Sequence, residues 1–419
     1  PCFEEIHPSS YKRKKRTGKK EEDLSGFEVT ETIEYKLAGE DRYCPDCGKK
    51  YKVVTKETVK RLKFVPAKFE VVEEVTCVYS CPECGSMKRP EKTPPLVGGG
   101  SIATPSLVAG IMNAKYVNGM PLARQEREFA RYNLNLSTKT MANWIIGCAD
   151  RYLKLLYDRM KEEFLKSRYI HCDETRIQVI GEPDQKGSTQ NWMWVYLTDE
   201  YSGSPRMALF DYERTRAGYH PVKFLDGRFH GYLTCDGYQA YQGLDDSITV
   251  TGCFTHARRR FDAALTALKK DFTKEQLKET VAYNAMTRIG ILYKVEELIR
   301  NKTPEERHEE RQKQSRPVVD ALFEWLHSME DSVDRSSLIG DAILYTLNQE
   351  PYLRRYLDDG HLSIDNNSAE RAIKNFAVGR RNWLFAKSIR GADASAVVYS
   401  VTELSLIHIS EPTRRSYIS

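Results

Sequence analysis

The chain has 419 residues, of which 40% are hydrophobic and 29% charged, and its formal net charge is +5. That length suffices for two or three domains, and the composition is typical of globular proteins, not of disordered or fibrous ones. The longest apolar runs, such as residues 144–149, are far shorter than the roughly 20 residues that cross a bilayer, and no signal-peptide pattern opens the chain. We therefore expect a cytoplasmic protein without a membrane partner.

The N-terminal region is strongly basic. Residues 11–20 contain seven Lys or Arg in ten positions, and such a block repels itself unless it meets phosphate. A solvated linker and a DNA-contacting arm both remain open as interpretations. Because the first residue is Pro1 and not Met, we assign residues 1–40 to a basic linker, the remnant of a truncated N-terminal region.

Four cysteines form two matched knuckles, CPDCG and CPECG. In each, a tight turn lets two thiolates bind the same ion, and two knuckles complete a tetrahedral zinc site. The alternative is that these residues only form turns and bind no metal. Strand-like alternation between them predicts a β-hairpin pair, so residues 41–95 are expected to form a zinc ribbon that holds structural Zn²⁺. Cys77 is assigned to a packed or surface thiol. The predicted zinc ligands are Cys44, Cys47, Cys81 and Cys84.

A joint rich in Pro and Gly ends the ribbon, and helical spacing follows over residues 96–166. A helix from Leu122 to Arg131, a turn, and a second helix with Ser137 or Thr138 as its N-cap have the proportions of a helix-turn-helix. An ordinary helical bundle is the alternative, since proportions alone do not establish base recognition.

From residue 167 the pattern changes to strands. Three β-rich runs joined by turns predict an antiparallel meander, and a crossover helix and a returning strand follow. This order predicts an α/β fold with a mixed sheet of the ribonuclease-H-like kind over residues 167–268. It places Asp173 on the first strand and Asp236 at the end of the fourth. Glu174 should lie on the opposite face of the sheet from Asp173, because side chains alternate along a strand.

Long helical spacing over residues 269–358 predicts an insertion into this core, since so long a segment is more than a loop needs. Within it, residues 301–317 are expected to form a charged joint. Just before it, Arg258, Arg259 and Arg260 are candidates for holding phosphate, with a solvated helix face as the alternative.

The core resumes over residues 359–403 with a helical segment that carries Glu370. Asn366 and Asn367 precede this glutamate by about one turn, and we expect them to cap its helix. Trp383 is assigned to packing, with base stacking as the alternative. Residues 404–419 abandon the preceding pattern and resemble a translated sequencing adapter, so they are excluded as an artefact. The cations predicted to hold DNA phosphates here are Arg371, Lys374, Arg380 and Arg381.

Carboxylates at strand ends are costly to bury unless something binds them. Hard divalent cations take oxygen ligands and leave positions open for phosphate oxygens. Asp173, Asp236 and Glu370 therefore predict a site for two Mg²⁺ or Mn²⁺ ions that acts on phosphodiesters.

Several motifs together resemble one family. The segment DNNSAERAIKNFAVGRRNWLF, together with GYLTCDGYQAY, HCDET, GCFTHARRRF and the paired knuckles, is similar in content and order to transposases of the bacterial insertion-sequence-sixty-six family. The resemblance implies that Asp173, Asp236 and Glu370 are the catalytic, metal-binding triad of a DDE transposase. It also implies that Cys253 and His256 form a structural C-x-x-H pair.

The resemblance further implies partners and a reaction. We expect Mg²⁺-dependent cleavage of terminal inverted repeats and strand transfer into target DNA, by a homo-oligomer assembled on the nucleoid, with small companion proteins of the same element. Two rivals remain: a hydrolytic nuclease or resolvase of the same fold, and a zinc-ribbon DNA-binding protein with an inactive core.

Overall fold

The computed structural model describes residues 94–98, 101–183 and 190–410, together with 69–84, 86–91 and short pieces between 29 and 50; of residues 242 and 405–410 it describes the backbone alone. The chain divides into two compact units, residues 1–92 and 93–419.

In the first unit, the described residues contain a short antiparallel hairpin of β1 (Tyr79–Ser80) and β2 (Met87–Lys88), which pair Tyr79 with Lys88. Cys81 and Cys84 lie in its turn, where Cys81 N–H donates to the Ser86 carbonyl over 2.8 Å. The hairpin pair predicted between the two knuckles falls mostly outside the described residues.

The second unit is built on a six-stranded mixed sheet, in the order β5-β4-β3-β6-β7 with β8 paired to the far end of β3. β3, β4 and β5 form an antiparallel meander, and β6 and β7 add in parallel. The predicted meander, crossover helix and returning strand are confirmed. The strands are β3 (Tyr169–Val179), β4 (Gln190–Thr198), β5 (Ala208–Glu213), β6 (Gly231–Thr234), β7 (Ile248–Thr251) and β8 (Phe385–Ala386).

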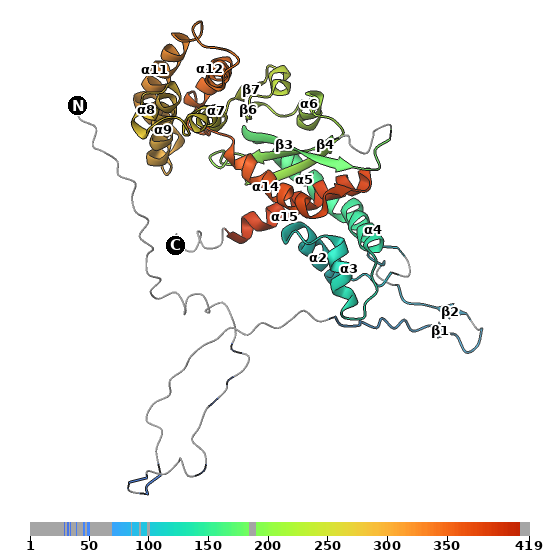
Figure 1. Ribbon diagram of the computed structural model, residues 1–419. Coiled ribbons are helices and arrows are strands. Elements are labelled where there is room, and N and C mark those ends of the chain that lie inside the picture. The colour runs from blue at the N-terminus through green and yellow to red at the C-terminus, as the bar shows by residue number, and fades with distance from the viewer. Residues whose placement is uncertain are drawn as a thin grey trace. The chain divides into compact units, whose positions relative to one another are not determined.

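Helices from both ends of the second unit pack around this sheet (Figure 1). The helix that carries Glu370, α14, contacts β3 and β4, and the following helix, α15, contacts β5. The predicted N-cap is confirmed, since Ser137 Oγ accepts from the Thr140 N–H over 3.2 Å. The helices around the sheet are α2 (Pro105–Met112), the π-helix η2 (Asn113–Val117), α3 (Leu122–Ala130), α4 (Thr138–Cys148), the π-helix η3 (Ala149–Leu153), α5 (Lys154–Phe164), α6 (Tyr219–Leu225), the 3₁₀-helix η4 (Gln239–Gly243), α14 (Asn367–Trp383) and α15 (Ile389–Ser410).

A second set of helices, which follows β7, has a hydrophobic core of its own. That core includes Tyr169 of β3, which stacks on His361 at 4.7 Å between ring centroids, so the helices are packed onto the sheet and not merely tethered to it. They are α7 (Phe254–Leu268), α8 (Lys274–Lys278), α9 (Val281–Ile299), α10 (Pro304–Glu310), the π-helix η5 (Arg311–Ser315), α11 (Arg316–His327), α12 (Leu338–Asn348), α13 (Glu350–Leu353) and the 3₁₀-helix η6 (Arg354–Leu357).

The prediction of a charged joint over residues 301–317 is wrong. Thr303 and Glu306 form a capping box that starts α10, and Arg307 and Arg311 are buried at 1% and 0% exposure. Arg311 donates to both carboxylate oxygens of Glu296 (2.8 and 2.7 Å) and to three backbone carbonyls. Arg311 is therefore buried with acceptors for its guanidinium, whereas only Nη2 of Arg307 has partners, the Glu296 carboxylate and the Leu362 carbonyl at 3.4 Å each.

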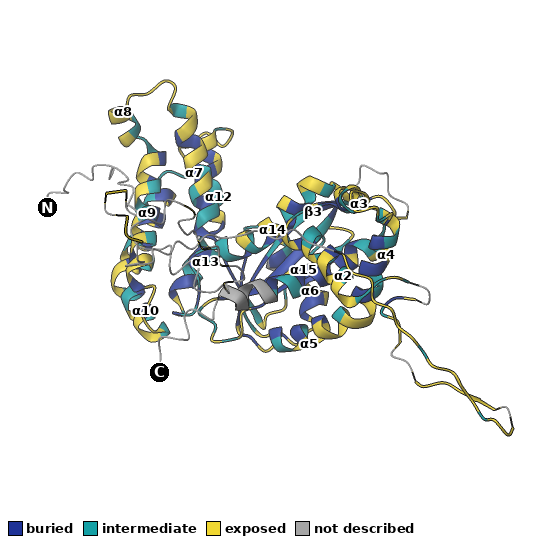
Figure 2. Cartoon of the chain, turned by 90° about the horizontal axis from the view of Figure 1, so that it is seen from below, coloured by how far each residue is buried: buried dark blue, intermediate teal, exposed yellow. Residues whose placement is uncertain are grey.

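Burial follows the layers (Figure 2). Strands β3 to β5 are largely buried, as is the inner side of most helices that cover the sheet or the second core, whereas the outer helical faces are exposed. This alternation is the 3.6-residue amphipathic pattern expected of helices that cover a core.

Candidate active site

Asp173 lies in the middle of β3, the central strand, opposite Val195 of β4. It follows four buried residues that fix the strand in the sheet. The Oδ1 atom of Asp173 accepts the backbone N–H of Glu174 over 2.9 Å. Burial and the negative charges of Glu174, Asp236 and Glu370 raise the pKa of Asp173 well above its ordinary value. The three predicted carboxylates are thus close enough to repel one another.

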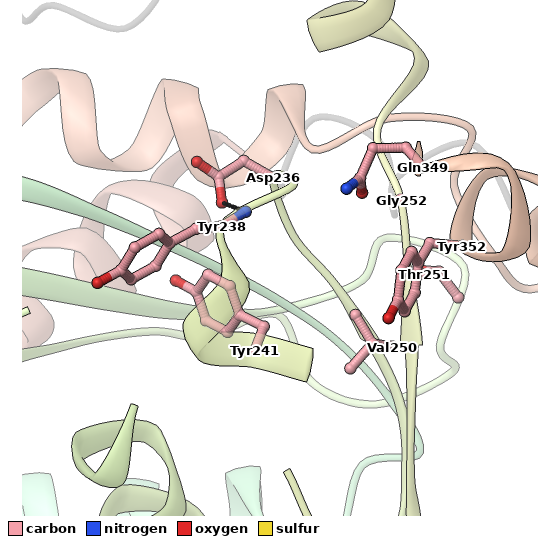
Figure 3. A pocket seen from close by; sticks show the side chains of 8 residues that line it. All are labelled: Asp236, Tyr238, Tyr241, Val250, Thr251, Gly252, Gln349 and Tyr352. Carbon is pink, nitrogen blue, oxygen red and sulfur yellow. Dashed lines mark hydrogen bonds between the residues drawn. The ribbon is translucent and has the colours of Figure 1, made fainter. Parts of the chain in front are cut away.

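Asp236 follows β6, which runs parallel to β3 and ends at Thr234. Its Oδ1 atom accepts the Tyr238 N–H over 3.0 Å (Figure 3), and its Oδ2 atom lies 3.6 Å from the Arg216 guanidinium. Figure 3 shows Gln349 of the insertion beside the same recess. The recess is lined by Asp236, Tyr238, Tyr241, Val250, Thr251, Gly252, Gln349 and Tyr352.

Glu370 lies in the first turn of α14, where a helix N-terminus favours negative charge. Arg259 of α7 binds it with both guanidinium branches, one of them over 2.9 Å. The His256 imidazole lies 3.7 Å from the same carboxylate, and burial lowers the pKa of that histidine. Arg259 thus contacts both carboxylate oxygens of Glu370.

The charges of the three carboxylates suggest a metal site, but their positions do not form one in this structure. Their charges interact, yet no group of three or more Cys, His, Asp or Glu side chains is placed to hold a metal ion in the part of the chain that the structure describes. Arg259 forms an ion pair with Glu370.

Glu174 is not the surface charge that single carboxylates usually are. Arg216 Nε donates to its Oε1 atom over 2.6 Å, and the Tyr241 hydroxyl donates to Oε2. Burial and the charge of Asp236 raise the pKa of Glu174. Because Arg216 contacts both Glu174 and Asp236, it links two carboxylates that the sequence places 62 residues apart. Nothing in the sequence pattern singles out Arg216.

A buried polar network joins β3 to the start of α14. His171 is 0% exposed, and its ring nitrogens lie 2.7 Å from Asp199 Oδ2 and 2.9 Å from Asn366 Oδ1. Burial lowers the pKa of His171, but the Asp199 carboxylate and the hydrogen bonds more than offset it, so the net shift is upward. The network sets the distance between the strand that carries Asp173 and the helix that carries Glu370.

The expectation that Asn366 caps α14 with its side chain is wrong. Asn366 occupies the N-cap position, but its side chain makes no capping hydrogen bond. Instead its Nδ2 atom donates to the Cys172 carbonyl over 2.7 Å, and its backbone N–H donates to Cys253 Sγ over 3.2 Å. A buried amide is stabilised more by a bond to a buried strand carbonyl than by a solvent-facing cap. Asn367 donates to Asp365 Oδ2 over 2.7 Å.

Replacing Asn366 by Ala should lower the free energy of unfolding by roughly 2–6 kcal/mol, because it leaves two buried partners unsatisfied at about 1–3 kcal/mol each. Urea denaturation followed by circular dichroism measures the loss. Asn367→Ala is the matched control and should cost at most about 1 kcal/mol, since Asp365 is partly exposed. Equal losses in the two variants would show that the network does not hold α14 to β3.

The cations predicted to bind DNA, and Trp383, differ in exposure and in the groups they contact. Arg371, Lys374 and Arg381 are exposed along α14, whereas Arg380 turns back to β3 and donates to Thr175 Oγ1 over 3.3 Å. Arg258 lies 5.6 Å from the Tyr293 ring centroid. Trp383 packs edge-on against Phe376 at 5.6 Å between centroids, as expected of a core aromatic.

Two of the four predicted zinc ligands can be described. Cys84 is exposed and Cys81 half-buried, and hydrogen bonds with Ser86 and then with Cys81 lower the pKa of Cys84 to about 7. A thiol that ionises near neutral pH is suited to bind zinc, since the thiolate is the ligand. Cys44 and Cys47 lie outside the described residues, and Cys77 is exposed.

Comparison with known proteins identifies the family. The model of the Transposase IS66 family matches residues 100–394, which is most of the second unit. The chain belongs to the IS66 transposase family. A second model, the zinc-finger binding domain of transposase IS66, matches residues 41–85 and spans all four knuckle cysteines. The resemblance noted in the sequence is thereby confirmed.

Relatives of this IS66 chain include three uncharacterized proteins of Sinorhizobium fredii. The protein y4hP is 30% identical over 383 residues, which cover 88% of this chain and 68% of the relative. The protein y4qI is 30% identical over 381 residues, and y4jD is 29% identical over 378. Among the described residues of the present chain, no helix is long and apolar enough to span a membrane.

Proposed function

We propose that this chain is the DNA transposase of a bacterial insertion sequence, which cleaves the ends of its element and joins them to target DNA. The observation that carries the proposal is the match of the IS66 transposase family to residues 100–394. The charges of Asp236 and Glu370, which help to raise the pKa of Asp173, support assigning the three carboxylates to one site. The strand order, an antiparallel meander followed by two parallel strands, supports a ribonuclease-H-like core.

The donor set fits divalent metal ions of the hard class. Three carboxylates supply only oxygen, and a cation among them would remove the repulsion that raises the pKa of Asp173. We propose Asp173, Asp236 and Glu370 as ligands of two Mg²⁺ or Mn²⁺ ions, which would polarise the phosphate and stabilise the attacking and leaving oxygens.

The chain's own cations have separate roles in this proposal. Arg259 leaves Glu370 and pairs with a DNA phosphate, so that one bidentate contact replaces another. Arg216 stays with Glu174 and holds that carboxylate apart from the reaction. His256 faces Glu370, and its lowered pKa keeps it neutral at physiological pH.

The proposal also assigns DNA binding to the N-terminal part of the chain. A zinc ribbon over residues 41–95 and the helices α3 and α4, in a helix-turn-helix arrangement, would bind the terminal inverted repeats. We further propose that the protein acts as a homo-oligomer that pairs two ends, with companion proteins of the same element.

The test uses the full chain and a duplex that carries the inverted repeat flanking this reading frame. Wild type should nick the repeat in Mg²⁺ and transfer a pre-cleaved 3′-hydroxyl end into plasmid DNA. Glu370→Gln should lower both rates more than about 100-fold, because loss even of residues that support metal ligands costs 10–100-fold. The exposed Glu309→Gln is the matched control and should leave both rates unchanged.

Each other outcome identifies a rival. Cleavage without end joining would indicate a nuclease or resolvase, and binding without cleavage by wild type would indicate a DNA-binding protein with an inactive core. Cleavage by Glu370→Gln at the wild-type rate would remove Glu370 from the site.

A further inference from the structure

A second site lies further along β3 from Asp173. It is a cavity of about 330 Å³ between the ends of β3, β4 and α14. Its lining is polar and basic apart from two aliphatic side chains, and consists of Arg176, Ile177, Gln178, Gln190, Arg380 and Leu384. None of these residues contacts the recess beside Asp236.

The charge in this cavity is uncompensated within the described part of the chain. Arg380 donates to the Arg176 carbonyl and to Thr175 Oγ1, so its contacts are neutral acceptors, and no ion pair of Arg176 or Arg380 is found among the described residues. Burial and the nearby charges of Arg381 and Arg176 lower the pKa of Arg380. Cations gathered without a carboxylate are stabilised when an anion binds between them.

The wall of the cavity is held in a strained conformation. Leu384 ends α14 with φ 62° and ψ −49°, close to the classic γ-turn that non-glycine residues rarely adopt. Its N–H donates to the Arg380 carbonyl over 2.7 Å, and the next residue, Phe385, pairs with Gln178 of β3. Such strain persists where surrounding contacts fix it, and it is concentrated at binding sites.

One arginine of the lining, Arg176, lies over an aromatic ring. The Arg176 guanidinium lies 5.7 Å from the Trp192 ring centroid, and Arg216 approaches the same ring at 5.0 Å. An arginine held over a ring keeps its guanidinium plane in place and needs less ordering when it binds phosphate.

We propose that this cavity binds the phosphodiester backbone of the DNA strand that runs to the carboxylate site. Arg176 and Arg380 contact the phosphate oxygens, and the glutamine amides contact the sugar or base edges. Arg380 contacts Thr175, which lies two residues beyond Asp173 on the same face of β3, about 7 Å along the strand, so the phosphate that Arg380 holds lies within a few nucleotides of the reacting one. The inference rests on the proposed function, because it takes DNA as the ligand.

The experiment measures the salt dependence of binding by the full chain to the fluorescently labelled inverted-repeat duplex without divalent metal. Each phosphate contact contributes about 0.9 to the slope of log K against log salt concentration. Arg176→Gln should therefore reduce the magnitude of the slope by about 0.9, the contribution of one phosphate contact. Arg176→Lys, which keeps the positive charge, should leave the slope unchanged. Arg335→Gln, which removes an exposed arginine of the insertion, is the matched control and should leave the slope unchanged.

An unchanged slope in Arg176→Gln would overturn the proposal, as would an equal decrease in Arg335→Gln. A thermal melt of each variant shows that the fold is retained, and Arg176 is exposed. This test does not depend on catalysis. If the slope falls but the protein never cuts DNA, the phosphate site is supported and the proposed function fails. If the slope is unchanged and the protein cuts DNA, the proposed function stands and the phosphate site fails.

Discussion

Asp173→Asn should abolish Mg²⁺-dependent cleavage, with a loss of more than about 100-fold, while it raises the melting temperature of the metal-free protein by a few degrees. Both effects have one cause. Burial and the charges of Glu174, Asp236 and Glu370 disfavour an ionised Asp173, and the asparagine side chain removes that charge without changing the size of the group.

The gain in stability should depend on pH. The pKa of Asp173 is higher in the folded protein than in the unfolded chain, so its stability contribution is fully present below the unfolded value, about 3.9, and is lost as pH rises through the folded value. The difference between Asp173→Asn and wild type should therefore be small near pH 4 and larger at pH 8.

Differential scanning fluorimetry in EDTA across this pH range, and again with Mg²⁺, measures the effect. Mg²⁺ should stabilise wild type and have no effect on Asp173→Asn, because a ligand that binds the folded state raises its stability. The exposed Asp246→Asn is the matched control and should follow wild type throughout. A variant at position 173 that melts and cuts as wild type does would remove this carboxylate from the site.

The second large effect is expected at Gly231, where β6 begins. A Cβ atom built there would lie 2.2 Å from the Arg168 carbonyl oxygen, and the φ angle of 156° is one that other residues rarely adopt. The same carbonyl accepts the Tyr232 N–H over 2.7 Å, which aligns β6 with β3. Gly231→Ala must therefore push β6 away from β3, and Asp236 follows β6.

We expect Gly231→Ala to lower the free energy of unfolding by about 3 kcal/mol or more, the sum of overpacking and backbone strain. Urea denaturation measures this, and cleavage should fall in parallel. Gly243→Ala is the matched control, since nothing lies within 4 Å of the added carbon and its φ is not positive. If both variants unfold at the same urea concentration, the close approach at Gly231 does not determine the register of β6.

Local pattern was enough to predict the strands and the positions of Asp173 and Asp236, because alternation and turn residues act over a few positions. It did not predict the contacts of those residues. The Arg259 pair with Glu370 spans 111 positions, and the Asn366 bond to Cys172 spans 194. Such contacts arise from tertiary packing, which leaves no periodic trace in the sequence.

The burial of Arg307 and Arg311 was missed for a related reason. Charge density along residues 301–317 is typical of solvated segments, and only the placement of Glu296 and of carbonyls near residues 356–362 makes burial favourable. The family resemblance implied a structural role for His256 beside Cys253, although its ring also faces Glu370.

The bond between Asn366 and the Cys172 carbonyl has a consequence for synthesis of the protein. A ribosome adding ~5–20 residues per second needs roughly 10–40 s to make the 194 residues between the two partners. During that interval the nascent chain carries β3 without α14, the helix that carries Glu370. We therefore expect a newly emerging chain to be unable to cut DNA near its ribosome.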